Sequence, residues 1–140
     1  MRCAPFLVLV LPYAVELDGA VTFAIFRPGA DGERGWHALT GDPARGEPPL
    51  DAARRISGAP ADAAWMKLDS RATIELPAAS CGVPEYAFAV RVMPDEIAPR
   101  PRLDCRWVSY EIADRLLHAE SDRNALYELR RRLGRLAPCC

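Results

Sequence analysis

The sequence predicts an α+β fold in which a mixed β-sheet lies between helices, as an α/β/α layered sandwich. Two observations predict it: several short apolar or alternating runs are typical of strands, and three segments carry helical spacing between or after them. The composition agrees, because the 140 residues are 50% hydrophobic and 26% charged, which is typical of a globular chain. This length suits a single domain covering residues 1–140.

The first elements predicted are two strands that form a hairpin. Residues 6–13 are a continuous apolar run, which suits a strand covered on both faces. A turn signal, Leu-Asp-Gly, follows at residues 17–19, and residues 21–27 are rich in β-branched and aromatic side chains. The polar, glycine-rich segment at 28–35 is then expected to be a loop.

A short helix is predicted from Pro48. It starts with two prolines, which a helix tolerates only in its first turn. Its apolar residues then recur along one stripe: Leu50, Ala53 and Ile56. Because Gly58 and Pro60 both oppose continuation, we expect only two or three turns.

The remaining segments predict three strands and two helices. The strand candidates are residues 72–76, 85–92 and 106–110. Ser109 is placed to cap a helix over residues 110–118. In the last helical segment Asp122 is placed as the N-cap, and the apolar stripe is Leu126, Leu129 and Leu133.

Charge and cysteine usage exclude some classes of function. The formal net charge of -1 gives no broad field to attract nucleic acid or an anionic membrane, and no apolar stretch has the length of a membrane span. The cysteines are odd in number and scattered, without a C-x-x-C pair: Cys3, Cys81, Cys105, Cys139 and Cys140. We therefore expect a reducing, cytoplasmic location.

Residues 40–55, TGDPARGEPPLDAARR, carry the clearest motif. They resemble the first two-thirds of the Nudix box, G-x5-E-x7-R-E-U-x-E-E-x-G-U, with Gly41, Glu47 and Arg55 at the required spacing. WHALTGD at 36–42 is similar to the opening W-x-x-x-T-G of the dATP and dihydroneopterin triphosphate pyrophosphohydrolase branch. DCRWVSYEIADRLL and SDRNALYELRRRL resemble the closing segment of that branch.

This resemblance implies a reaction and a cofactor. In the Nudix family, glutamates on the box helix bind Mg²⁺ or Mn²⁺, which polarises phosphoryl oxygens and activates the water that attacks a diphosphate linkage. The corresponding positions here are Ile56, Ala59 and Pro60, and none of these side chains can ligate a metal. The box is therefore degenerate, and the resemblance leaves Glu47 and Arg55 as the remnant catalytic positions.

The roles of these remnants are predicted with alternatives. Glu47 either helps to bind a cation or stabilises the start of the helix as an anion. Arg55 matches the family arginine that pairs with the glutamate replaced by Ile56, so we expect Arg55 to point to solvent or to a ligand phosphate. The predicted substrate-binding residues are Trp36, Gly41, Arg55 and Trp107, although both tryptophans could instead belong to the core.

A relocated metal site would need Glu47, Glu85 and Asp104 to converge, and Asp104 is otherwise an ordinary loop acid.

The sequence supports two hypotheses about the function of the chain. The first is a weak or inactive hydrolase that still binds a nucleotide, a pterin phosphate or another diphosphate-containing ligand, with no cofactor. The second is an active pyrophosphohydrolase of nucleoside or pterin triphosphates that uses Mg²⁺ or Mn²⁺ on relocated carboxylates. The resemblance also implies a possible homodimer.

Overall fold

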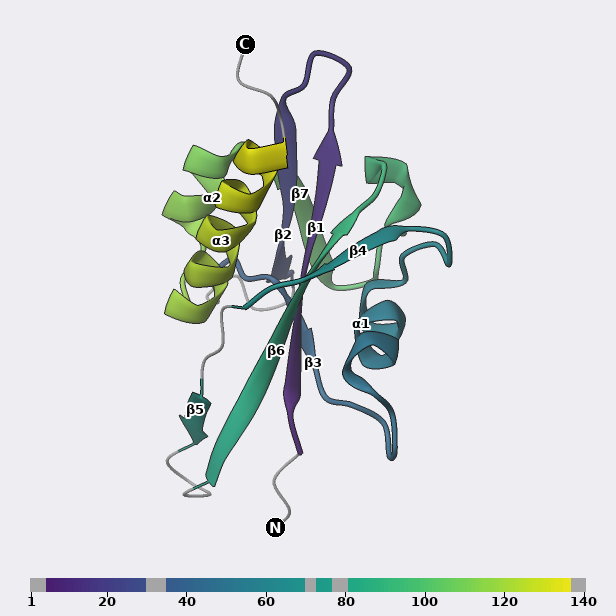
Figure 1. Cartoon of the computed structure of the whole chain (residues 1–140), viewed down its shortest axis with the longest axis vertical. Helices are drawn as coiled ribbons and strands as arrows, with labels where there is room; N and C mark the ends of the chain where they lie inside the picture. The colour runs from purple at the N-terminus through teal and green to yellow at the C-terminus, as the bar shows by residue number, and fades with distance from the viewer. Residues whose placement is uncertain (1–4, 30–34, 70–72, 77–80, 137–140) are drawn as a thin grey trace.

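The computed structural model describes residues 5–29, 35–69, 73–76 and 81–136, and Figure 1 shows how its elements are arranged. The strands are β1 (Leu7–Val15), β2 (Val21–Pro28), β3 (Leu39–Gly41), β4 (Ala64–Lys67), β5 (Thr73–Leu76), β6 (Cys81–Arg91) and β7 (Leu103–Val108). The helices are α1 (Pro49–Ser57), α2 (Tyr110–Leu116) and α3 (Glu120–Leu136), with a 3₁₀ turn η1 at Pro94–Glu96.

Strand β1 is the centre of a mixed sheet. It pairs in parallel with β6 along one edge and antiparallel with β2 and β3 along the other. The described strands have the order β4-β6-β1-β2-β7, with β3 added to β1 and β5 to β6. The predicted hairpin of β1 and β2 is confirmed, with Tyr13 opposite Phe23.

The two faces of the sheet are covered by different helices, as Figure 1 shows. Side chains along β1 alternate between the faces. Val8 and Val10 pack in a cluster with Ala52 and Ala53 of α1. Leu9 and Leu11 pack in a second cluster with residues of α2 and α3, such as Leu126. The layered α+β architecture is therefore confirmed, and both faces of β1 are buried as its continuous apolar run predicts.

Helix α1 is short, as predicted. Pro49 lies in its first turn, where a missing N–H removes no helical hydrogen bond. At the other end Gly58 adopts a left-handed conformation with φ of 67°, and its N–H donates to the carbonyl of Arg54 at 3.0 Å. This glycine cap ends the helix after nine residues, before Ala59 and Pro60.

The structure contains two strands that the sequence analysis did not predict, contradicts one predicted helix cap and confirms another. Strands β3 and β4 were missed. Asp122 is not the N-cap of α3: the helix begins at Glu120, and Asp122 is buried within its first turn, accepting a hydrogen bond from the N–H of Ala38 at 3.2 Å. Ser109 does cap α2, because its hydroxyl accepts from the N–H of Ile112.

Candidate functional site

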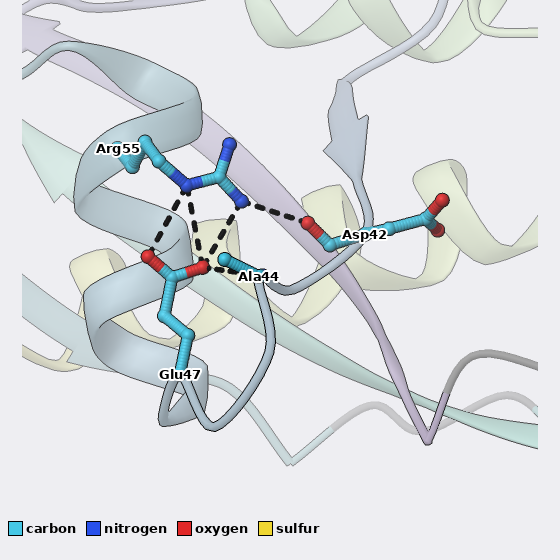
Figure 2. A network of polar contacts seen from close by, with 4 residues as sticks. All are labelled: Asp42, Ala44, Glu47 and Arg55. Carbon is cyan, nitrogen blue, oxygen red and sulfur yellow. Dashed lines mark hydrogen bonds and ion pairs between the residues drawn. The ribbon is translucent and has the colours of Figure 1, made fainter.

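An ion pair ties the loop before α1 to the body of the helix (Figure 2). The guanidinium of Arg55 donates to the carboxylate of Glu47, with Nε 3.1 Å from Oε2 and Nη2 3.0 Å from Oε1. The same Nη2 donates to the carbonyl of Asp42 at 2.8 Å, and the N–H of Ala44 donates to Oε1 of Glu47 at 2.8 Å. These bonds fix the conformation of the loop against the helix.

The pair also sets the charge state of both groups. The pKa of Glu47 is lowered, chiefly by the hydrogen bond from Arg55 and then by the N–H of Ala44, and the pKa of Arg55 is raised by the same bond. Arg55 therefore has a carboxylate partner, Glu47, in place of the family glutamate replaced by Ile56. Half of the Arg55 side chain is exposed. A ligand contact by Arg55 thus stays a prediction.

Gly41 lies directly against Ile56, the residue at the first missing glutamate position. A Cβ added at Gly41 would lie 2.7 Å from Cδ1 and 2.9 Å from Cγ1 of Ile56, closer than side chains can approach. A side chain at position 41 would therefore require Ile56 to move. The end of β3 and the last turn of α1 are joined here by an apolar contact instead of by a metal ligand.

Hydrogen bonds of Ser57 and Arg100 hold the last turn of α1, and neither residue occupies a glutamate position of the box. The hydroxyl of Ser57 donates to the carbonyl of Arg54 at 3.3 Å and accepts from the N–H of Ala59 at 3.2 Å. Nη2 of Arg100 donates to the carbonyl of Ile56. Sequence inspection missed Arg100, because it lies 44 residues from its partner and belongs to no recognisable motif.

This donor set does not fit a magnesium ion. Mg²⁺ requires oxygen ligands, and Ile56, Ala59 and Pro60 provide no side-chain oxygen. The carboxylate of Glu47 is already bonded to Arg55 and Ala44. Within the described residues, no three histidine, cysteine, aspartate or glutamate side chains gather into a group that could hold a metal ion.

The carboxylates considered for a relocated site also lie apart. Glu85 is buried on the face of the sheet covered by α3, where it lies near Asp122. Asp104 forms an ion pair with Arg27 at 3.4 Å on the outer pair of strands, β2 and β7. Glu47 precedes α1 on the opposite face from Glu85. The described structure therefore does not bring the three carboxylates together as one metal site.

Glu85 and Asp122 form a buried acidic pair that the sequence did not reveal. Burial, and secondarily the charge of Asp122, raise the pKa of Glu85 to about 7. Burial also raises the pKa of Asp122, although the hydrogen bond from Ala38 and the charge of His37 oppose this. The pair lies on the face away from the box, so it belongs to the core and not to the candidate site.

The two predicted tryptophans lie on opposite faces of the sheet. Trp36 packs in the cluster beneath α2 and α3, is 9% exposed, and has the guanidinium groups of Arg27 and Arg106 at 4.6 and 5.5 Å from its ring centroid. Trp107 packs in the cluster that contains α1. They cannot form one stacking platform, and a ligand contact by either residue stays a prediction.

The arrangement described here, a mixed sheet between helices with a glycine, a loop glutamate and a helix arginine joined as one unit, defines a protein of the Nudix hydrolase class. A crystal structure of a putative Nudix hydrolase from Listeria monocytogenes is similar with 30% identity and a TM-score of 0.76, over 94% of this chain and 96% of that chain. The chain belongs to the Nudix hydrolase family.

More distant structures share the fold. The dihydroneopterin triphosphate pyrophosphohydrolase of E. coli has 17% identity and a TM-score of 0.72, covering 90% of this chain and 96% of that chain. The Nudix domain of NrtR from Shewanella oneidensis, solved with ADP-ribose, has 11% identity and a TM-score of 0.68, covering 95% and 90%. No family model and no curated protein matches the chain. No described helix has the length and apolar character needed to cross a membrane.

Proposed function

We propose that this chain is a Nudix protein that hydrolyses diphosphates weakly or not at all and binds a nucleotide or another diphosphate-containing ligand. The observation that carries the proposal is the last turn of α1. Ile56 packs on Gly41, and the helix ends at Gly58 before Ala59 and Pro60. All three glutamate positions of the box thus lack a side-chain oxygen that could bind a metal.

The expected loss of rate is large. A tenfold fall in rate corresponds to about 1.4 kcal/mol of barrier, and removing groups that act together in catalysis typically costs several factors of ten. Three positions are changed here in one motif. The alternative, an active Mg²⁺- or Mn²⁺-dependent pyrophosphohydrolase with relocated carboxylates, has no group of acids to support it among the described residues.

Binding depends on features that the chain keeps. The loop between β3 and α1 is fixed by the Glu47–Arg55 pair, and the Arg55 side chain is half exposed, so that a phosphate can approach its guanidinium. The ADP-ribose complex of the NrtR domain and the pterin triphosphate named for the E. coli enzyme support a nucleotide or pterin phosphate as the ligand class. A homodimer and a cytoplasmic location belong to the same proposal.

A thermal-shift screen tests the binding half of the proposal. Nucleotides, dinucleotide polyphosphates and pterin phosphates are each added with EDTA, with Mg²⁺ and with Mn²⁺. A ligand at 100 times its dissociation constant stabilises the native state by about 2.7 kcal/mol, which raises Tm by several degrees. We expect a shift in EDTA. A shift seen only with a divalent cation would favour the enzyme, and no shift with any ligand would contradict the proposal.

A further inference from the structure

Arg100 places a positive charge at the end of α1. It lies between η1 and β7 and is half-buried. Its Nη2 donates to the carbonyl of Ile56, and a Cβ added at Gly58 would lie 3.6 Å from the same atom. The guanidinium therefore lies beside the turn where the box helix of an active Nudix enzyme would present its glutamates.

The charge of Arg100 has no carboxylate partner among the described residues, where the ion pairs join other groups. The carbonyl end of α1 offsets the charge only in part. One of the five N–H groups of the guanidinium is used by Ile56, which leaves others to donate. Within the described residues Arg100 interacts with the Cys105 thiol but pairs with no carboxylate, so its remaining N–H groups are suited to bind an anion.

We propose that Arg100 takes the electrostatic place of the divalent cation and binds a phosphoryl group of the ligand directly. The proposal rests on the proposed function, because it assumes that a diphosphate lies at the loop and the end of α1. A guanidinium presents a planar fork that matches phosphate oxygens. The apolar side chains of Ile56 and Ala59 do not repel a phosphate, whereas glutamates without a metal would. Ligand binding is therefore independent of divalent cations.

Arg100 also caps α1, and this structural role predicts a different result. A cap stabilises the free protein, so its loss lowers Tm without ligand. A direct contact between Arg100 and a phosphate ligand instead lowers the dissociation constant of the folded protein for that ligand. Measuring both quantities on the same variants separates the two roles.

The experiment is titration calorimetry with inorganic pyrophosphate and with ADP, each in EDTA and again in MgCl₂. The proteins are the wild type, Arg100→Gln, Arg100→Lys and Arg123→Gln, the last an exposed arginine on α3 across the sheet. We expect the wild type and Arg123→Gln to bind equally, without strengthening by Mg²⁺. Arg100→Gln should bind at least about tenfold more weakly, and Arg100→Lys should be intermediate.

The outcomes separate the two proposals. Equal binding by folded Arg100→Gln and wild type in EDTA would overturn the role of Arg100 and leave the proposed function intact. A wild type that binds neither probe in any buffer would overturn the proposed function itself. Binding that requires Mg²⁺ would contradict the replacement of the cation.

A second measurement covers the case in which Arg100→Gln does not fold. Phenylglyoxal modification of the wild type, mapped by mass spectrometry, reports the accessibility of each arginine. Pyrophosphate in EDTA should slow the modification of Arg100 and leave that of Arg123 unchanged. Equal modification of Arg100 with and without pyrophosphate would refute the contact.

Discussion

At the scale of single residues, Glu47 and Arg55 show how motif positions can persist for structure. The carboxylate of Glu47 accepts bonds from both Arg55 and Ala44, which join the two ends of the loop–helix unit. The sequence left a metal-binding and a stabilising role open for Glu47. Its bonds favour the stabilising role, because its oxygens are already used by donors within the motif.

Glu47→Gln should therefore lower Tm by breaking the ion pair. The lowered pKa of Glu47 gives the sign of the pH dependence. The stabilisation that the ion pair gives to the folded state is present above the ordinary carboxyl pKa of 4.5. It is lost as the pH falls through the lower pKa that Glu47 has in the folded state. Thermal unfolding from pH 3 to 8 measures it, with Glu16→Gln as an exposed control. A wild-type stabilisation by Mg²⁺ that Glu47→Gln abolishes would instead identify a metal ligand.

Glu85 gives a prediction of opposite sign. Its pKa rises from 4.5 to about 7 on folding, because burial and the charge of Asp122 disfavour the carboxylate. The folded state thus holds the proton more tightly, and stability falls as the pH rises from about 4.5 to 7. This shift corresponds to roughly 3 kcal/mol at pH 8.

Glutamine is uncharged, like the protonated form of Glu85. Glu85→Gln should therefore remove the loss of folding stability that ionisation of Glu85 causes at high pH. We expect the variant to be more stable than the wild type at pH 8 and equally stable near pH 4.5. Denaturant unfolding at both pH values measures the difference. A wild type that is more stable than the variant at pH 8 would contradict a destabilising Glu85 carboxylate.

At the scale of elements, β3 and α1 are fitted to each other through Gly41 and Ile56. Gly41→Ala would place its Cβ 2.7 Å from Ile56, and overpacking of this kind typically costs about 1–3 kcal/mol. Shortening Ile56 to Ala removes the clashing atoms. In a double-mutant cycle, the cost of Gly41→Ala should therefore fall in the Ile56→Ala background. Additive costs would contradict the close contact.

Elements differed in how well they could be predicted from the sequence. The β1–β2 hairpin and α1 carry local signals, namely apolar runs, a turn, prolines and Gly58, and the structure confirms them. Strand β3 has three residues and is defined by pairing with β1, so no local pattern reveals it.

The candidate site was predictable only in part. Spacing identified Gly41, Glu47 and Arg55, and the absence of the glutamates was visible directly. The contact of Arg100 with Ile56 depends on tertiary folding. Asp122 has the residue type of a cap, but its burial beneath Ala38 follows from the packing of α3 on the sheet.

At the scale of the whole molecule, fold and catalysis are separable. The two hydrophobic clusters lie on opposite faces of the sheet. Neither cluster needs a glutamate at the three box positions, so the Nudix fold forms without these glutamates. Ile56 and Ala59 instead pack against the cluster beneath α1. The chain keeps the architecture of its family and an apolar surface where the metal ligands would be.

The most direct test of this account is the initial rate of pyrophosphate release from dATP and other nucleoside triphosphates, measured in MgCl₂ and in MnCl₂. We predict little or no release above the rate without protein, and the same result for Glu47→Gln. Robust, cation-dependent release by the wild type that disappears in Glu47→Gln would contradict the account.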